Sequence, residues 1–244
     1  INNSISLYIY VLCFFEIATI SSLFAAPFIK PCKSGDSACL LSSAQAAVPY
    51  LANGVPELGI KSLDPMHLEL IKGDQGGLAL TFKDTTVTGM KGCHVDGLKH
   101  DLKKAKQVVT IRCSVDLNGQ YKLDGQLLVL PIKGEGKYHI KIRDIVIKTT
   151  TDLTTVSGAD GKKHWHIDSW KFGSQVKTSA RFDFDNLFNG NKILAGPVED
   201  FVNTNWRDVM QEIAPPIVHA IVARVVEGVE ALYKAVPADE LFIE

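Results

Sequence analysis

The chain has 244 residues, with 26 Lys and Arg residues against 27 Asp and Glu residues. This length is enough to bury a substantial apolar core, as one large domain or two small ones. Because the charges nearly cancel, the chain has no general electrostatic attraction for nucleic acid or for an anionic membrane surface. We therefore expect a partner that is selected by shape and by apolar contact.

The first 26 residues have the pattern of a secretory signal peptide. Residues 7–24 are mostly apolar and aromatic, with Glu16 as their one charged residue, and Ala25 and Ala26 supply the small residues of a cleavage site. The stretch approaches the roughly 20 residues of a membrane span, but the secreted character of the sequence that follows favours a signal that is removed. We expect a secreted, extracellular protein in which residues 27–244 form a single domain.

Four cysteines follow the signal, and an even number in a secreted chain indicates disulfides. Cys32 and Cys39 close a short loop, and we predict that they are bonded. Cys93 and Cys113 fall opposite each other if their strands pair about a turn near Lys103. They form either a cross-strand disulfide or two buried thiols. Neither pair has the short C-x₂₋₄-C spacing of a zinc site.

A helix is predicted over Ser37–Asn53. Asp36 or Ser37 can cap its first turn, Gly54 ends it, and Pro49 can kink its last turn. Its apolar residues recur at helical spacing: Leu40, Leu41, Ala44, Val48 and Leu51.

Residues 77–184 alternate between apolar and polar with a period of two. This pattern predicts a meander of long antiparallel strands with one apolar face and one solvated face. Asn118-Gly119 and Ala159-Asp160-Gly161 predict hairpin turns.

Two helical stretches follow, at residues 198–213 and 217–233, and Pro215-Pro216 is predicted to interrupt them. The second stretch is apolar over much of its circumference, so most of its surface must be covered. Its charged residues argue against a membrane span. The economical fold is α+β: a strongly curved antiparallel sheet wrapped around a long C-terminal helix, giving an elongated domain.

Several sequence motifs resemble those of a known family. NLFNGNKILAG and VEDFVNTNWRDVMQEIAP follow Asp185, and AVPADELF ends the chain. GQYKLDGQLLVLPIKGEG begins at Gly119, and GVPELGIKSLDP begins at Gly54 after the Cys32-x₆-Cys39 pair. Together they closely resemble the takeout and juvenile-hormone-binding family of insects, over essentially the whole mature chain. NTNW and LFNGNK point to the takeout branch, whereas hormone carriers usually place their second disulfide differently from Cys93 and Cys113.

This resemblance implies a tubular lipid-binding fold with an internal apolar tunnel. It also implies a secreted carrier, not an enzyme, that binds a terpenoid or fatty-acid-like molecule. The expected partner is thus a hydrophobic small molecule, with a receptor of unknown identity. We expect a monomer with no cofactor, no metal, no nucleic acid and no stable membrane insertion.

Three other functions have some support in individual residues. His164 and His166 with Asp168 form a possible metal half-site, but a polar outer strand face explains them more simply. No G-x-S-x-G pentapeptide supports an esterase. A membrane-active or microbial-lipid-binding defence protein of the same fold is the alternative function, with the basic residues 99–106 as its patch. A solvated hairpin turn also explains that segment.

The expected tunnel residues are the inward side chains of the sheet and of the helix. Tyr121 and Tyr138 are the expected polar groups, because a buried phenol needs a partner. Leu127, beside the small Gly125, is expected to line the tunnel and not the solid core. The full set is Leu80, Phe82, Tyr121, Leu123, Leu127, Val129, Tyr138, Ile140, Ile142, Trp165, Phe182, Phe184, Trp206, Met210 and Ile213.

Overall fold

The computed structural model describes residues 26–33 and 35–243, so the predicted signal peptide lies outside the described residues except for Ala26. The first helix, α2 (Ser37–Asn53), has the predicted bounds. The Asp36 side chain accepts a hydrogen bond from the backbone N–H of Cys39 at 3.0 Å, which caps the helix. Gly54, at φ 84°, ends it. The Cys32–Cys39 disulfide is confirmed, with a Cα–Cα distance of 5.7 Å.

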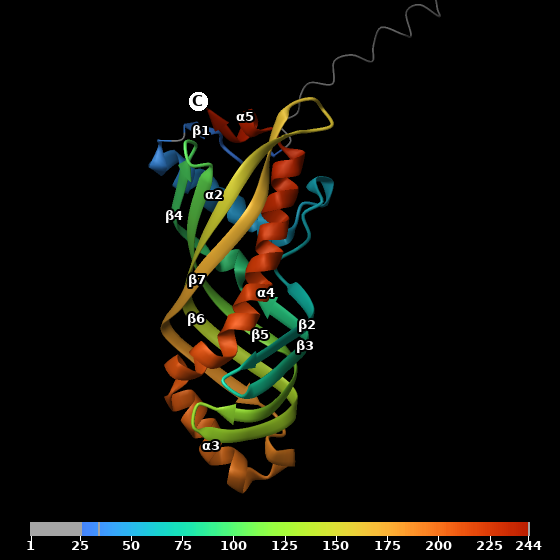
Figure 1. The fold of residues 1–244 in the computed structure, drawn as a ribbon, viewed down its shortest axis with the longest axis vertical. Coiled ribbons are helices and arrows are strands. Elements are labelled where there is room, and N and C mark those ends of the chain that lie inside the picture. The colour runs from blue at the N-terminus through green and yellow to red at the C-terminus, as the bar shows by residue number, and fades with distance from the viewer. Residues whose placement is uncertain (1–25, 34, 244) are drawn as a thin grey trace, which may run out of the picture.

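One antiparallel sheet forms most of the molecule and curves along its length (Figure 1). Its strands run in the order β2-β3-β5-β6-β7, and β4 pairs with β5 beyond the end of β3. The long strands carry register shifts at Cys113–Val115 and Arg143–Ile145, and such bulges bend a strand and increase its twist. The bounds are β2 (Met66–Gln75), β3 (Leu78–Thr88), β4 (His94–Asp101), β5 (Lys106–Leu127), β6 (Leu130–Ser157) and β7 (Lys163–Phe184).

The predicted hairpin at Asn118-Gly119 is wrong. Both residues lie inside β5, where Gly119 pairs with Tyr138. A Cβ atom at Gly119 would lie 2.7 Å from the carbonyl oxygen of Lys83, so the glycine allows the close approach of β3. The hairpin turn falls later, between Leu127 and Leu130.

The last third of the chain is helical, with a break at a different residue from the one predicted. Helix α3 (Lys192–Thr204) ends at Asn205, and α4 (Trp206–Ala235) continues through Pro215 and Pro216. Short elements fill the connections and the C-terminus: η1 (Pro56–Leu58), η2 (Met90–Gly92), η3 (Phe188–Gly190), α5 (Ala238–Leu241) and the two-residue strands β1 (Cys32–Lys33) and β8 (Phe242–Ile243).

Helix α4 fills the concave face of the sheet and runs along the long axis of the molecule (Figure 1). By length and composition alone it could cross a membrane, as core helices can. Its apolar residues, however, pack against the strands: Val209, Ile213, Ile217 and Val218 are all buried in the main core. The α+β architecture, a long C-terminal helix against a large curved antiparallel sheet, is therefore confirmed.

Two side chains from the C-terminal helices cover the free edge of the sheet at β7. The amide of Asn203 accepts from the backbone N–H of Phe182 and donates to its carbonyl oxygen, both at 2.9 Å. Glu230 of α4 accepts from the backbone N–H of Ile167 at 2.9 Å and bonds His166 Nδ1 at 2.7 Å. These bonds supply edge groups of β7 with partners that a further strand would otherwise provide.

Candidate functional site: two adjoining apolar cavities

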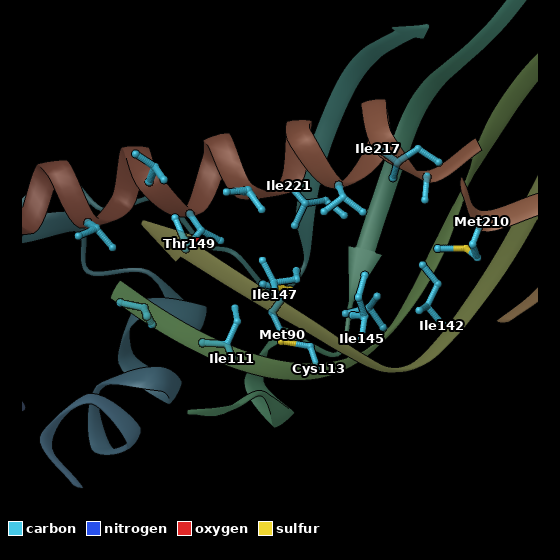
Figure 2. A pocket seen from close by; sticks show the side chains of 18 of the residues that line it. Met90, Ile111, Cys113, Ile142, Ile145, Ile147, Thr149, Met210, Ile217 and Ile221 are labelled. Carbon is cyan, nitrogen blue, oxygen red and sulfur yellow. The ribbon is translucent and has the colours of Figure 1, made fainter. Parts of the chain in front are cut away.

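A first cavity, the sheet cavity, lies between α4 and the inner face of β5 and β6 and has a volume of about 120 Å³. Figure 2 shows Ile217 and Ile221 of α4 facing Ile145 and Ile147 of the sheet across this space. Its wall is almost entirely hydrocarbon. The lining residues with polar side chains are Gln107, Thr149 and Thr151.

A second cavity, the helix cavity, lies between α2, the start of β5 and the C-terminal half of α4, and has a volume of about 210 Å³. Within the described part of the chain, its one charged lining residue is Lys30, which is exposed. The hydroxyl of Ser43, also in the wall, is bonded to the backbone N–H and carbonyl of Lys30 at 2.9 and 2.8 Å. This cavity is thus as apolar as the first.

The two cavities adjoin, because six residues line both. They are Met90, Gln107, Val109, Ile111, Val225 and Val229. The Cys93–Cys113 disulfide lies at the same boundary, since Cys113 lines the sheet cavity and Cys93 lines the helix cavity. Its Cα–Cα distance is 4.4 Å, which confirms the cross-strand bond.

Polar groups at the boundary come from β5, β6 and α4. Gln107 pairs in register with Thr151, whose hydroxyl donates to the Gln107 carbonyl oxygen at 3.4 Å. The Tyr233 hydroxyl donates to Gln107 Oε1 at 2.8 Å. Tyr233 is 5% exposed, and burial raises the pKa of its phenol, so it stays protonated. The phenol acts here only as a neutral hydrogen-bond donor.

Five of the fifteen residues predicted to line a tunnel lie in the wall of the sheet cavity. All five are buried residues that α4 and the middle of the sheet bring together: Ile140, Ile142, Phe182, Met210 and Ile213.

Seven others are buried in the main core and line neither of the two cavities. Both predicted polar groups are among them, and each phenol bonds to protein atoms. Tyr121 donates to the carbonyl oxygen of Asp185 at 2.6 Å, and Tyr138 bonds Thr85 Oγ1 at 2.7 Å. Burial raises the pKa of Tyr138 to about 12. The seven are Leu80, Phe82, Tyr121, Leu123, Leu127, Tyr138 and Phe184.

The predicted open space beside Leu127 at Gly125 is filled by the backbone of a neighbouring turn. A Cβ atom at Gly125, φ 137°, would lie 2.2 Å from the carbonyl oxygen of Gly77, so the missing side chain admits the β2–β3 turn. Leu127 is 1% exposed in the solid core. Val129 was predicted to point inward, but it lies in the β5–β6 turn and is 73% exposed.

The two predicted tryptophans lie at opposite ends of α4 and outside both cavities. Trp165 belongs to a smaller core at the C-terminal end of α4, where it stacks on His100 with ring centroids 4.5 Å apart. Trp206 begins α4, packs against the edge of the main core and carries the Arg207 guanidinium over its ring at 4.3 Å.

The outer-face prediction for the histidine pair is wrong for His164, which is 4% exposed. Its Nδ1–H donates to the Tyr233 carbonyl oxygen at 3.0 Å, and Nε2 lies 3.1 Å from both carboxylate oxygens of Asp160. His166 bonds Glu230 as described above. Within residues 26–33 and 35–243, no three His, Cys, Asp or Glu side chains are grouped to hold a metal ion.

The basic segment 99–106 forms the β4–β5 hairpin, with its turn at residues 102–105. Its charges are partly paired: Lys104 lies 3.8 Å from Asp101, and Lys106 forms an ion pair with Asp152. This arrangement matches the solvated hairpin that the sequence also allowed.

Sequence reasoning missed the polar part of the cavity wall. Gln107 is in phase with Val109, Ile111 and Cys113 on the inner face of β5, and it is the one polar residue in that series. Thr149 and Thr151 likewise continue the inward series of Ile145 and Ile147 on β6. A polar residue in a series of otherwise apolar, inward-facing residues was the sequence signal that could have identified this part of the wall.

Comparisons with known proteins agree with this architecture. The model of the haemolymph juvenile hormone binding protein family matches residues 9–243. The circadian clock-controlled protein daywake of Drosophila melanogaster is 28% identical over 226 residues, covering 88% of this chain and 86% of that protein. A putative beta-carotene-binding protein of Schistocerca gregaria is 22% identical over 204 residues, covering 82% and 81%. The crystal structure of Takeout 1 from Epiphyas postvittana superposes with a TM-score of 0.85 at 31% identity, covering 88% of this chain and 100% of that one.

Proposed function

Because the chain belongs to the haemolymph juvenile hormone binding protein family, we propose that it is a secreted carrier of one long hydrophobic molecule. The ligand, terpenoid or fatty-acid-like, would occupy both cavities as one internal tunnel. The protein would bind and release it without chemical change. Residues 1–26 would act as the signal peptide, and residues 27–244 as the single carrier domain.

The observation that carries this proposal is the shared wall of the two cavities. Val109, Ile111, Val225 and Val229 line both spaces, so a flexible chain in one cavity meets the same side chains as a chain in the other. Val225 and Val229 are only half-buried, although they line both cavities in the interior of the molecule. An apolar, concave space with few polar groups is the usual form of a site for a lipid.

The expected affinity follows from burial of the ligand. Each methylene group that leaves water contributes about 0.8 kcal/mol, so a dozen such groups give roughly 10 kcal/mol before the costs of association and ordering. Micromolar binding is therefore reachable without a charged contact. Selectivity must come from the length of the cavities and from the polar groups at their boundary.

The test is extraction of the natural protein with organic solvent, followed by mass spectrometry. We expect an intact hydrophobic molecule in about equal molar amount to the protein. Recovery of only a reaction product, such as a free acid and an alcohol from one ester, would support an enzyme instead. Recovery of mixed phospholipid in large excess, with leakage from vesicles, would support the membrane-active alternative.

A further inference from the structure

The boundary between the two cavities contains a buried polar side chain from β5, Gln107. Gln107 is 6% exposed and lines both cavities, among valine and isoleucine side chains. A buried carboxamide without partners costs free energy, so each of its polar atoms requires an explanation.

The oxygen of that carboxamide has a hydrogen-bond partner, the hydroxyl of Tyr233. The protonated phenol donates to Gln107 Oε1 at 2.8 Å, and the Thr151 hydroxyl donates to the backbone carbonyl oxygen of Gln107 at 3.4 Å. A phenol needs an acceptor for its proton, and within the carboxamide only the oxygen accepts. The contact with Tyr233 therefore orients the amide so that its NH₂ group faces away from Tyr233.

The amide nitrogen has no hydrogen-bond acceptor among the described residues, and it is not one of their fully enclosed unpaired polar atoms, so it borders accessible space. It carries two N–H groups beside space that a ligand would fill. A ligand that presents an oxygen there recovers a hydrogen bond, whereas a pure hydrocarbon leaves the donors unsatisfied.

On the basis of the proposed carrier function, we infer that Gln107 recognises a carbonyl oxygen, of a ketone or an ester, in the interior of a long neutral ligand. The position follows from the shared wall: a molecule that occupies both cavities passes Gln107 between its two ends. Neutrality follows from the lining, because the only charged residue in either wall, among the residues that the structure describes, is the exposed Lys30.

Three ligands with the same number of carbon atoms test the inference: diheptyl ketone with a central carbonyl, methyl tridecyl ketone with a terminal one, and pentadecane with none. Each displaces the fluorescent dye N-phenylnaphthylamine from the full mature chain. The main variant is the double substitution Gln107→Leu with Tyr233→Phe, since removing both partners leaves no unpaired buried group. Gln107→Leu alone is the second variant. Gln120→Leu, on the exposed outer face of the same strand, is the matched control.

We expect the double variant to bind diheptyl ketone about fivefold more weakly, the equivalent of one ordinary hydrogen bond. Pentadecane should bind with the same affinity as before, and methyl tridecyl ketone should lose less than diheptyl ketone. Gln120→Leu should change none of the three.

Equal loss of all three ligands would assign Gln107 to the shape of the wall and overturn the inference. So would a double variant with unchanged affinities, or a Thr149→Val variant that loses more ketone affinity than the Gln107 variants. If the unmodified protein binds the dye and pentadecane but no ketone, the carrier function stands and the inference fails. If it binds none of the probes, the carrier function itself fails.

Discussion

The Tyr233 hydroxyl of α4 donates to the Oε1 of Gln107 on β5 at 2.8 Å, across 126 positions of sequence. The contact joins the central helix to the sheet at the boundary of the two cavities. Both side chains are buried, so each depends on the other for its hydrogen bond.

Gln107→Leu should lower the free energy of unfolding by about 1–3 kcal/mol, because it leaves the Tyr233 hydroxyl buried without an acceptor. Adding Tyr233→Phe should recover part of that loss. Denaturant unfolding of the wild type, both single variants and the double variant gives the coupling energy. Strictly additive losses would show that the hydrogen bond contributes nothing to stability.

A tryptophan at Val109 should block ligand uptake at little cost in stability. Val109 lines both cavities, so the larger ring has space to enter. Leu127→Trp is the matched change in the solid core of the same strand, where overpacking should cost about 1–3 kcal/mol. Melting temperature and dye uptake are measured for both. The positions of the cavities are refuted if Val109→Trp unfolds the protein while Leu127→Trp is tolerated and blocks uptake.

Asn203→Ala should destabilise the protein by about 1–3 kcal/mol, since it removes two hydrogen bonds from the edge of β7 and leaves Phe182 N–H without its acceptor. Thr204→Ala changes the exposed neighbour and serves as the control. Hydrogen exchange at the Phe182 amide should accelerate only in the Asn203 variant. Continued protection of that amide would mean that another group covers the strand edge.

Acid should destabilise the protein in part through His100. Burial lowers the pKa of His100, with a smaller opposing effect of Asp101, so the folded state binds its proton less readily than the unfolded chain. The contribution of neutral His100 to the free energy of unfolding is therefore fully present above the unfolded pKa of about 6.5. It is lost as the pH falls through the lower pKa of the folded state. His100→Phe keeps an aromatic ring beside Trp165 and Phe242 and should flatten the dependence of melting temperature on pH below about 6.5. The control is His67→Gln, a change at an exposed histidine. If melting temperature falls with pH equally in the wild type and in His100→Phe, the acid sensitivity belongs to other groups.

The two disulfides should differ in their contributions. In the loop-entropy estimate, the Cys93–Cys113 bond, which separates its partners by 20 residues, is worth about 3 kcal/mol, and the Cys32–Cys39 bond, at a separation of 7, about 2 kcal/mol. Denaturant unfolding should be measured for two variants, one with both Cys32 and Cys39 changed to alanine and one with both Cys93 and Cys113 changed to alanine. A larger loss from the Cys32 and Cys39 pair would show that effects in the folded state outweigh loop closure.

Signals that are local in sequence predicted the elements they control. Asp36 and Gly54 set the ends of α2, and both act through bonds to residues within a single turn. Strand β2 was missed because its alternation slips: Met66 and Leu68 are buried at even positions, but the next buried residue is Ile71. A strand that changes phase within ten residues has no clear period of two.

At Asn118-Gly119, two sequence signals conflict: Asn-Gly favours a hairpin turn, whereas the phase of the flanking apolar residues favours a continuous strand. Leu117 and Tyr121 share one phase, as they would in a single unbroken strand, and the structure follows that phase. The turn preference of Asn-Gly is weaker than the pairing of a long strand with neighbours on both sides.

The cavities could not be placed from the sequence. Alternation tells which side chains point inward, but Leu123 and Ile147 both do so, one in solid core and one beside open space. The difference depends on how far α4 stands from the sheet at each level. At Gly73 the approach is close, since a Cβ atom there would lie 2.9 Å from Pro216. Such distances arise from the whole packing and leave no local signal.

The position of α4 near the C-terminus determines when the protein can close. During synthesis the strands β2 to β7 are complete before Trp206–Ala235 emerges, so the concave face of the sheet lacks its filling helix until the end. The parallel pairing of Cys32 with Phe242 then joins the first described strand to the last. Folding must wait for nearly the whole chain, and the nascent sheet presents an open apolar trough to the surrounding medium.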